Sequence, residues 1–294
     1  MGINNSTEKK YNYKNIYQYI PDITDFRDKF ISLEDSDYSE IIDLRGSFPP
    51  VINIGEWNGS IAAALTSMIY YELVKLDEHI FIASRQFIYY NSLLYNSKTA
   101  NSFFLHTPSI RQSLKSISKW GICPEQYLPF DINNIHIKPN NDIYQLASKY
   151  SIDYYKVPST INDLKLVLNN KKSVILALPI YSSFHNSTVR LTGRIPYPEE
   201  RDINIGALSV VILGYFEDKE QFIIRMPFGD LWGDHGYGYI NYQYITQMGM
   251  DLWTFDINTK TECFEKIAIQ NIVNKKDNKS NNKTGNSNIL NRYI

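Results

Sequence analysis

The chain has 294 residues, enough for one large or two closely packed domains, and its 43% hydrophobic and 21% charged residues are typical of a globular protein. Its formal net charge of −1 gives no electrostatic reason to expect a nucleic acid as a partner. The two cysteines, Cys123 and Cys263, are too few for a disulfide framework, so we expect a reducing compartment and no secretion. No apolar run reaches the length of a membrane helix, and we expect no signal peptide.

The first twenty residues are polar, rich in Asn, Lys and Tyr, and without apolar periodicity, so we expect a mobile N-terminal arm. The arm begins with a Met-Gly-x-x-x-Ser pattern, which is the signal for N-myristoylation at Gly2. Lys9 and Lys10 would add attraction to anionic lipids, so peripheral membrane contact through an acylated N-terminus is expected. Residues 21–28 then form a charged turn expected to pack on the surface.

Residues 53–65 join an Asn- and Gly-rich turn to an alanine-rich helix. Apolar residues recur at helical spacing from Ser60 and predict a wide buried face; they are Ile61, Leu65, Met68, Ile69 and Leu73. The first backbone N–H groups of a helix need an acceptor, and serine is a favoured N-cap, so we expect Ser60 to cap the helix. The alternative role for Ser60 is a nucleophile at the positive end of the helix dipole.

A second amphipathic helix is predicted from Ser109 to a stop at Gly121, with Leu114, Ile117 and Trp120 on one face. Cys123 follows it, and since no neighbour would lower the pKa of its thiol, we expect a buried structural residue.

The second half of the chain changes to a β-rich pattern. Strands are predicted at residues 151–157, 173–180, 207–215, 221–225 and 236–242, with a short helix at 162–168. The sequence has no metal-binding or phosphate-binding motif, so we expect no metal and no cofactor. From about Lys275 the tail is low-complexity and expected to be flexible.

Several segments together resemble the papain-like cysteine proteases (peptidase C1) of bacteria and large DNA viruses. They are residues 21–28 (PDxxDxRD), 42–51 (VDLR…PPV), 53–65 (the nucleophile segment), 84–91 (SRxFIYYN), 121–131 (GVCPExxWPYD) and 232–240 (WGxxGYFxI). The resemblance covers about Pro21 to Phe255. It implies an α+β papain-like fold of two lobes, a helical lobe and a β-barrel-like lobe, with flexible N- and C-terminal tails and a cleft between the lobes. The implied organisation is an arm at 1–20, an opening segment and helical lobe at 21–150, a β-barrel-like lobe at 151–270 and a tail at 271–294.

The resemblance also locates the four positions that carry papain-type chemistry, and all four are substituted. Ser60 takes the place of the nucleophilic cysteine, Leu208 of the histidine, Met226 of the asparagine that orients the histidine, and Ile54 of the glutamine in the oxyanion hole. A hydroxyl without a base is a poor nucleophile, and loss of one oxyanion-hole donor typically reduces the rate about 10²–10³-fold. We therefore expect no catalytic residues and no enzyme.

The leading expectation is a pseudoprotease that serves as a binding or structural module. The partner would be a protein or extended peptide in the inter-lobe cleft, held by backbone hydrogen bonds and apolar pockets. The bias toward Asn, Ile, Lys and Tyr is typical of AT-rich genomes such as those of large DNA viruses, so we expect a cytosolic or virion-associated protein, peripheral on a membrane if Gly2 is acylated. The alternative is an atypical serine-type hydrolase that uses Ser60 with an unrecognised base.

Overall fold

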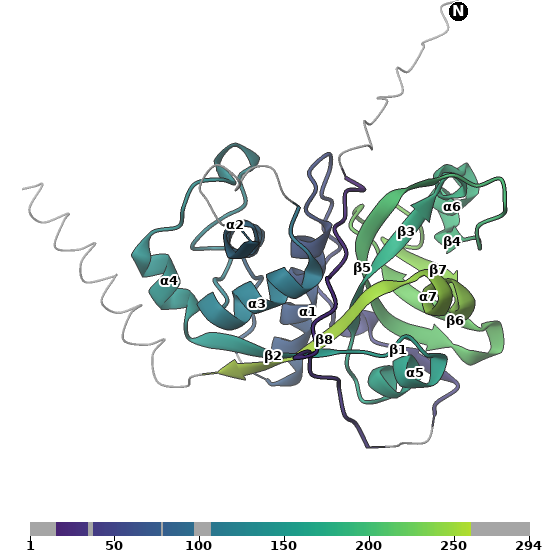
Figure 1. The fold of residues 1–294 in the computed structure, drawn as a ribbon, viewed down its shortest axis with the longest axis horizontal. Coiled ribbons are helices and arrows are strands. Elements are labelled where there is room, and N and C mark those ends of the chain that lie inside the picture. The colour runs from purple at the N-terminus through teal and green to yellow at the C-terminus, as the bar shows by residue number, and fades with distance from the viewer. Residues whose placement is uncertain (1–15, 35–37, 78, 97–106, 260–294) are drawn as a thin grey trace, which may run out of the picture. The chain divides into compact units, whose positions relative to one another are not determined.

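A computed structural model describes residues 16–34, 38–77, 79–96 and 107–259. Its β half is one eight-stranded sheet in the order β2-β8-β3-β5-β6-β7-β4, with β1 paired to β5 (Figure 1). The strands are β1 (Ile41–Asp43), β2 (Tyr150–Lys156), β3 (Val174–Tyr181), β4 (Arg194–Ile195), β5 (Asn204–Phe216), β6 (Gln221–Arg225), β7 (Tyr237–Asn241) and β8 (Met250–Thr259). The central strands β3 and β5 are buried along most of their length and are rich in apolar residues, as expected of strands covered on both faces.

The helices divide between the two halves of the molecule. They are α1 (Ser60–Lys75), α2 (Arg85–Asn96), α3 (Ile110–Trp120), α4 (Asn141–Ala147), α5 (Ile161–Asn169), α6 (Ser187–Thr192) and α7 (Tyr242–Met248). Helices α1 to α4 gather on one side, where α2 packs on α3, and α1 packs against β5 at the junction with the sheet (Figure 1). This arrangement of helices beside a sheet agrees with the predicted α+β architecture.

The predicted elements are found with shifts of one to three residues at their ends. The helix predicted at Ser109 begins at Ile110, with a capping box between the side chains and backbone of Ser109 and Gln112. The central helix begins at Ser60 as predicted, but the prediction that Ser60 caps it is wrong. The N-cap is Gly59, whose carbonyl accepts the Ala63 N–H at 2.9 Å, and the hydroxyl of Ser60 has a distant partner described below.

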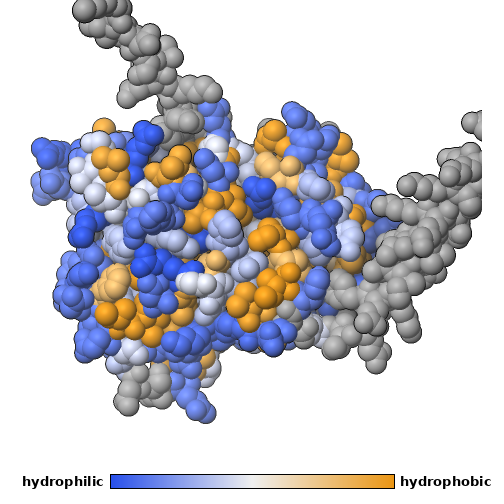
Figure 2. All heavy atoms as spheres, turned by 180° about the vertical axis from the view of Figure 1, so that it is seen from behind, coloured by the Kyte–Doolittle hydropathy of each residue, from blue (hydrophilic) through white to orange (hydrophobic). Residues whose placement is uncertain are grey.

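The described residues through Asn258 belong to one compact unit. The predicted lobe boundaries stay predictions. The tail at 271–294 and Gly2 lie outside the described residues, as do the first fifteen residues of the predicted arm. Within the described part of the chain, no helix is both long and apolar enough to span a membrane. On the face turned away in Figure 1, apolar residues form separate patches divided by polar ones (Figure 2).

Candidate functional site

The start of α1 faces strand β5, and Ser60 lies at the contact. Its side chain is buried, with 5% of the residue exposed, and its Oγ accepts the backbone N–H of Ser209 at 3.2 Å. This bond joins residues 149 positions apart in sequence. It explains why the hydroxyl does not cap its own helix, since Oγ points across to the sheet.

The other three family positions lie around this contact. Leu208, next to Ser209 on β5, is fully buried and pairs with Leu178 of β3. Met226 follows β6, is 1% exposed, and shares the lining of a void of about 10 Å³ with Ser209. Ile54 donates its N–H at 3.0 Å to the carbonyl of Pro227, the residue after Met226.

The structure therefore brings Ile54, Ser60, Leu208 and Met226 into one neighbourhood. Three of these side chains are apolar and buried, and the hydroxyl of Ser60 is the group among the four that can act as a nucleophile. Within the described residues, no group of three or more His, Cys, Asp or Glu side chains is placed to hold a metal ion. Cys123 is buried and free, and burial raises the pKa of its thiol to about 12, as expected of a structural cysteine.

The end of the N-terminal arm crosses this site, where it contacts both walls. On the sheet side, the N–H of Ala207 donates to the carbonyl of Tyr17 at 2.9 Å. On the helix side, Asn58 Nδ2 donates to the carbonyl of Gln18 at 3.2 Å. Ile16 and Tyr17 are buried, with 2% and 4% exposed, while Gln18 is exposed. In Figure 1 the dark purple trace passes between α1 and β5.

Gly206 allows the arm to come this close. A Cβ at this position would lie 2.2 Å from the carbonyl oxygen of Tyr17, and the φ of +127° is one that side-chain-bearing residues rarely adopt. Only glycine permits both the backbone conformation and the approach.

A row of aromatic rings lines the sheet side of the site next to the arm. Phe184 stacks on Trp232 with ring centroids 5.6 Å apart, and Phe228 lies 5.8 Å from Trp232. His185 continues the row, 5.9 Å from Phe184 and 5.8 Å from Tyr17. Burial lowers the pKa of His185 below its ordinary value, so the ring is neutral at pH 7.

Sequence reasoning missed the arm contacts and the parts played by Asn58 and Gly206. The one signal present was the apolar content at the end of the arm, where Ile16 and Tyr17 interrupt the polar run.

Tyr19 near the end of the arm and Asp22 just after it fix the arm to the body of the protein. The hydroxyl of Tyr19 donates to Asp251 Oδ2 at 2.5 Å, and the N–H of Asp22 donates to the same oxygen at 2.8 Å. The carboxylate of Asp22 accepts from the Ser109 hydroxyl and, at 2.9 Å, from Trp253 Nε1. Burial, the largest influence, raises the pKa of Asp22 in spite of the bond from Ser109. The segment expected to be a charged surface turn is thus half-buried at Asp22.

Arg111 on α3 completes this attachment. Its guanidinium donates to the carbonyl of Ile23 and forms an ion pair with Asp28, in which both side chains are less than 10% exposed. The same guanidinium lies 5.4 Å from the ring centre of Trp253, within cation–π distance.

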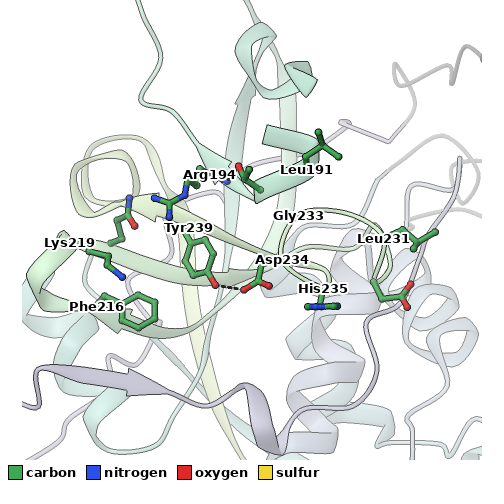
Figure 3. Close-up of a pocket in the computed structure, with 12 residues that line it drawn as sticks. Leu191, Arg194, Phe216, Lys219, Leu231, Gly233, Asp234, His235 and Tyr239 are labelled. Carbon is green, nitrogen blue, oxygen red and sulfur yellow. Dashed lines mark hydrogen bonds between the residues drawn. The ribbon is translucent and has the colours of Figure 1, made fainter. Parts of the chain in front are cut away.

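A hollow of about 800 Å³ lies elsewhere on the β half (Figure 3). Asp234, within it, accepts from the Tyr239 hydroxyl and, at 3.0 Å, from Arg45 Nη1. None of its lining residues is a family position or an arm contact. We therefore place the candidate site in the cleft between α1 and β5, where the arm is bound, and not in this hollow.

The comparisons with known proteins concern the family and the fold. No family model matches the chain. An uncharacterized peptidase C1-like protein of Acanthamoeba polyphaga mimivirus is 29% identical over 194 residues, which is 62% of this chain and 61% of that protein. Xylellain, a cysteine protease from Xylella fastidiosa, has 30% identity and a TM-score of 0.73 over 83% of this chain and 96% of its own. A procathepsin L 3 of the Tenebrio molitor larval midgut has the same fold at 16% identity, with a TM-score of 0.63 over 83% of this chain and 77% of its own.

These relatives contradict the expectation that the chain is no enzyme. Xylellain is a cysteine protease, and the viral relative is named as peptidase-like. The expectation came from four side chains, but the similarity to a working protease extends over nearly all of xylellain. With its fold and 30% identity to xylellain, the chain belongs to the papain-like cysteine proteases, the peptidase C1 family.

Proposed function

We propose that the cleft between α1 and β5 binds an extended polypeptide segment, and that residues 16–18 occupy it as an internal ligand. The observation that carries the proposal is the pair of hydrogen bonds from opposite walls, one to the Tyr17 carbonyl and one to the Gln18 carbonyl. Both bonds go to backbone oxygens, so they would hold any extended segment, whatever its side chains.

Gly206 provides the test, because it limits how closely a peptide backbone can approach. Gly206→Val places side-chain atoms where the Tyr17 carbonyl lies, so the arm and any peptide ligand should both be excluded. The first measurement is hydrogen exchange at the Ala207 amide. The second is binding of an immobilised panel of extended peptides, with every protein also carrying Tyr17→Ala because the arm covers the cleft. We expect fast exchange and lost binding in Gly206→Val. The matched control is Gly46→Ala, where an added Cβ meets nothing within 4 Å. Unchanged exchange and binding in a folded Gly206→Val protein would refute the proposal.

A second candidate is peptide-bond hydrolysis through Ser60. It is favoured by the protease relatives and by the place of Ser60 at the first turn of α1, where the helix dipole stabilises developing negative charge. Fluorophosphonate labelling of Ser60, absent in Ser60→Ala, would support it. The assay should use the chain with Tyr17→Ala, because the arm covers the site. No labelling in that variant would remove Ser60 as a nucleophile.

The proposal also includes where the protein acts, in a virus particle and at a membrane. A peptidase C1-like relative in a mimivirus supports a role in a large DNA virus, as a binding or structural component of the particle. The present chain spans 61% of that relative. Acylation at Gly2 would tether the protein weakly to a membrane, since a single acyl chain binds at roughly 10⁴ M⁻¹.

A further inference from the structure

The ring of Tyr17 is the part of the arm that the cleft encloses most specifically. The residue is 4% exposed, whereas Ile20, three positions later, is 41% exposed. The Tyr17 and His185 rings lie 5.8 Å apart at 60°, an edge-to-face arrangement within the range that aromatic pairs prefer.

The position of His185 is itself fixed by its surroundings. It ends the 3-10 helix Ser182–His185, whose first residues bond to Asp202 from the Ser182 hydroxyl at 2.9 Å and the Ser183 N–H at 3.1 Å. On its other side it meets Phe184 edge-on, at 83° between the ring planes. A ring held in this way presents a preformed surface, so a ligand loses little freedom to the ordering of the site.

The backbone contact and the ring contact depend on each other. The bond from Ala207 fixes the Tyr17 carbonyl against Gly206, and the side chain of the same residue then points to His185. A residue bound at this backbone position therefore has to place its side chain beside the histidine ring. The residue before it, Ile16, is 2% exposed, so the preceding position also encloses an apolar side chain.

We propose that His185 and the backbone at Gly206 and Ala207 form a subsite selective for an aromatic side chain preceded by an aliphatic one. This rests on the proposed function, and it narrows the ligand to extended segments that carry an aliphatic–aromatic pair. An alanine there leaves the ring surface of His185 uncovered, and a charged side chain there loses its hydration. The neutral state of His185 suits a ring contact, since an imidazolium buried there would need a counterion.

The test uses the full chain carrying Tyr17→Ala, which weakens the internal ligand. Fluorescent peptides with the sequence of residues 14–21 are titrated by anisotropy, with Tyr, Phe or Ala at the position of Tyr17. We expect the Tyr and Phe peptides to bind about tenfold more tightly than the Ala peptide. A peptide with Gln18→Ala is the matched control and should bind like the parent, because the Gln18 side chain is exposed and its contact is made by the carbonyl.

Adding His185→Ala to the protein should reduce the preference to less than about threefold, while His185→Phe should retain it. Thermal unfolding of each variant shows that it is folded, and His185→Leu replaces His185→Ala if the latter is not. Equal binding of all peptides would overturn the subsite and leave the peptide-binding function standing. Binding of none of them would remove the proposed function and the subsite with it. A preference that survives in folded His185→Ala would overturn the role of His185.

Discussion

The attachment of the arm to α3 gives the sharpest prediction of stability. Arg111→Met removes a guanidinium that bonds to Asp28 and to the Ile23 carbonyl, at a site where both members of the ion pair are less than 10% exposed. Methionine keeps most of the apolar stem, so the change acts on the charge. Asp28 is then left buried without its cation.

Removing one partner of a buried ion pair costs about 3–5 kcal/mol of unfolding free energy, because the remaining charge is desolvated and unpaired. The Ile23 carbonyl also loses its donor, but Ile23 is exposed and water can replace that bond, so the loss comes mainly from Asp28. Adding Asp28→Asn removes the stranded charge. The double variant should therefore recover part of the loss, with a coupling of about 2–3 kcal/mol between the two positions.

The assay is urea unfolding followed by far-UV circular dichroism, with the four proteins of the double-mutant cycle at one pH and salt concentration. Arg27→Met is the matched control, because Arg27 also pairs with an aspartate but its side chain is 73% exposed, and we expect its midpoint to equal that of the parent. A loss below about 1 kcal/mol in Arg111→Met would mean that the pair behaves like an exposed salt bridge. It would refute the claim that the Arg111–Asp28 pair holds the segment after the arm on α3.

Three further predictions concern single positions. Leu208→His should lower the unfolding free energy by at least about 1.5–3 kcal/mol, because Leu208 is fully buried. Burial lowers the pKa of a histidine below its unfolded value of about 6.5, so the unfolded state binds more protons at this residue as the pH falls. The loss of unfolding free energy should therefore be larger at pH 5.5 than at pH 7.5 in urea titrations. An equal loss at both pH values would contradict a buried ring. Cys123, with its pKa raised to about 12, should resist iodoacetamide at pH 7.5 until the protein unfolds, as peptide mass mapping would show, and rapid native alkylation would refute this. In cells with an N-myristoyltransferase, Gly2 should gain a myristoyl group visible by intact mass, and an unmodified or acetylated terminus would remove the membrane tether.

The scaffold could be predicted from the sequence because its elements are locally specified. The β3 and β5 runs are rich in apolar residues, and α3 carries its own capping box and a stop at Gly121. Each of these signals lies within the element that it defines. The resemblance to papain-like proteases then supplied the arrangement of elements that local signals leave open.

Ser60 shows where local rules fail. Serine at a helix start is a favoured cap, and that rule considers only the backbone groups of the same turn. The structure contains a competing donor, the Ser209 N–H, that lies 149 positions away in sequence. The Oγ of Ser60 accepts from this donor. Gly59 is therefore the N-cap of α1, and the start of the helix has no side-chain cap. No pattern within residues 53–65 could reveal the competitor.

The arm contacts were beyond prediction for a related reason. Composition described residues 1–20 as polar, and two buried residues among them are too few to form a periodic pattern. Their binding depends on Gly206, whose positive φ is set by the sheet, and on the attachment at Asp22 immediately downstream. A segment tethered this closely meets its site at an effective concentration on the order of millimolar or more, which favours its binding in the cleft. A separate peptide has no such advantage. An outside ligand must therefore bind more tightly than the arm sequence does, or the attachment at Asp22 and Arg111 must first be released.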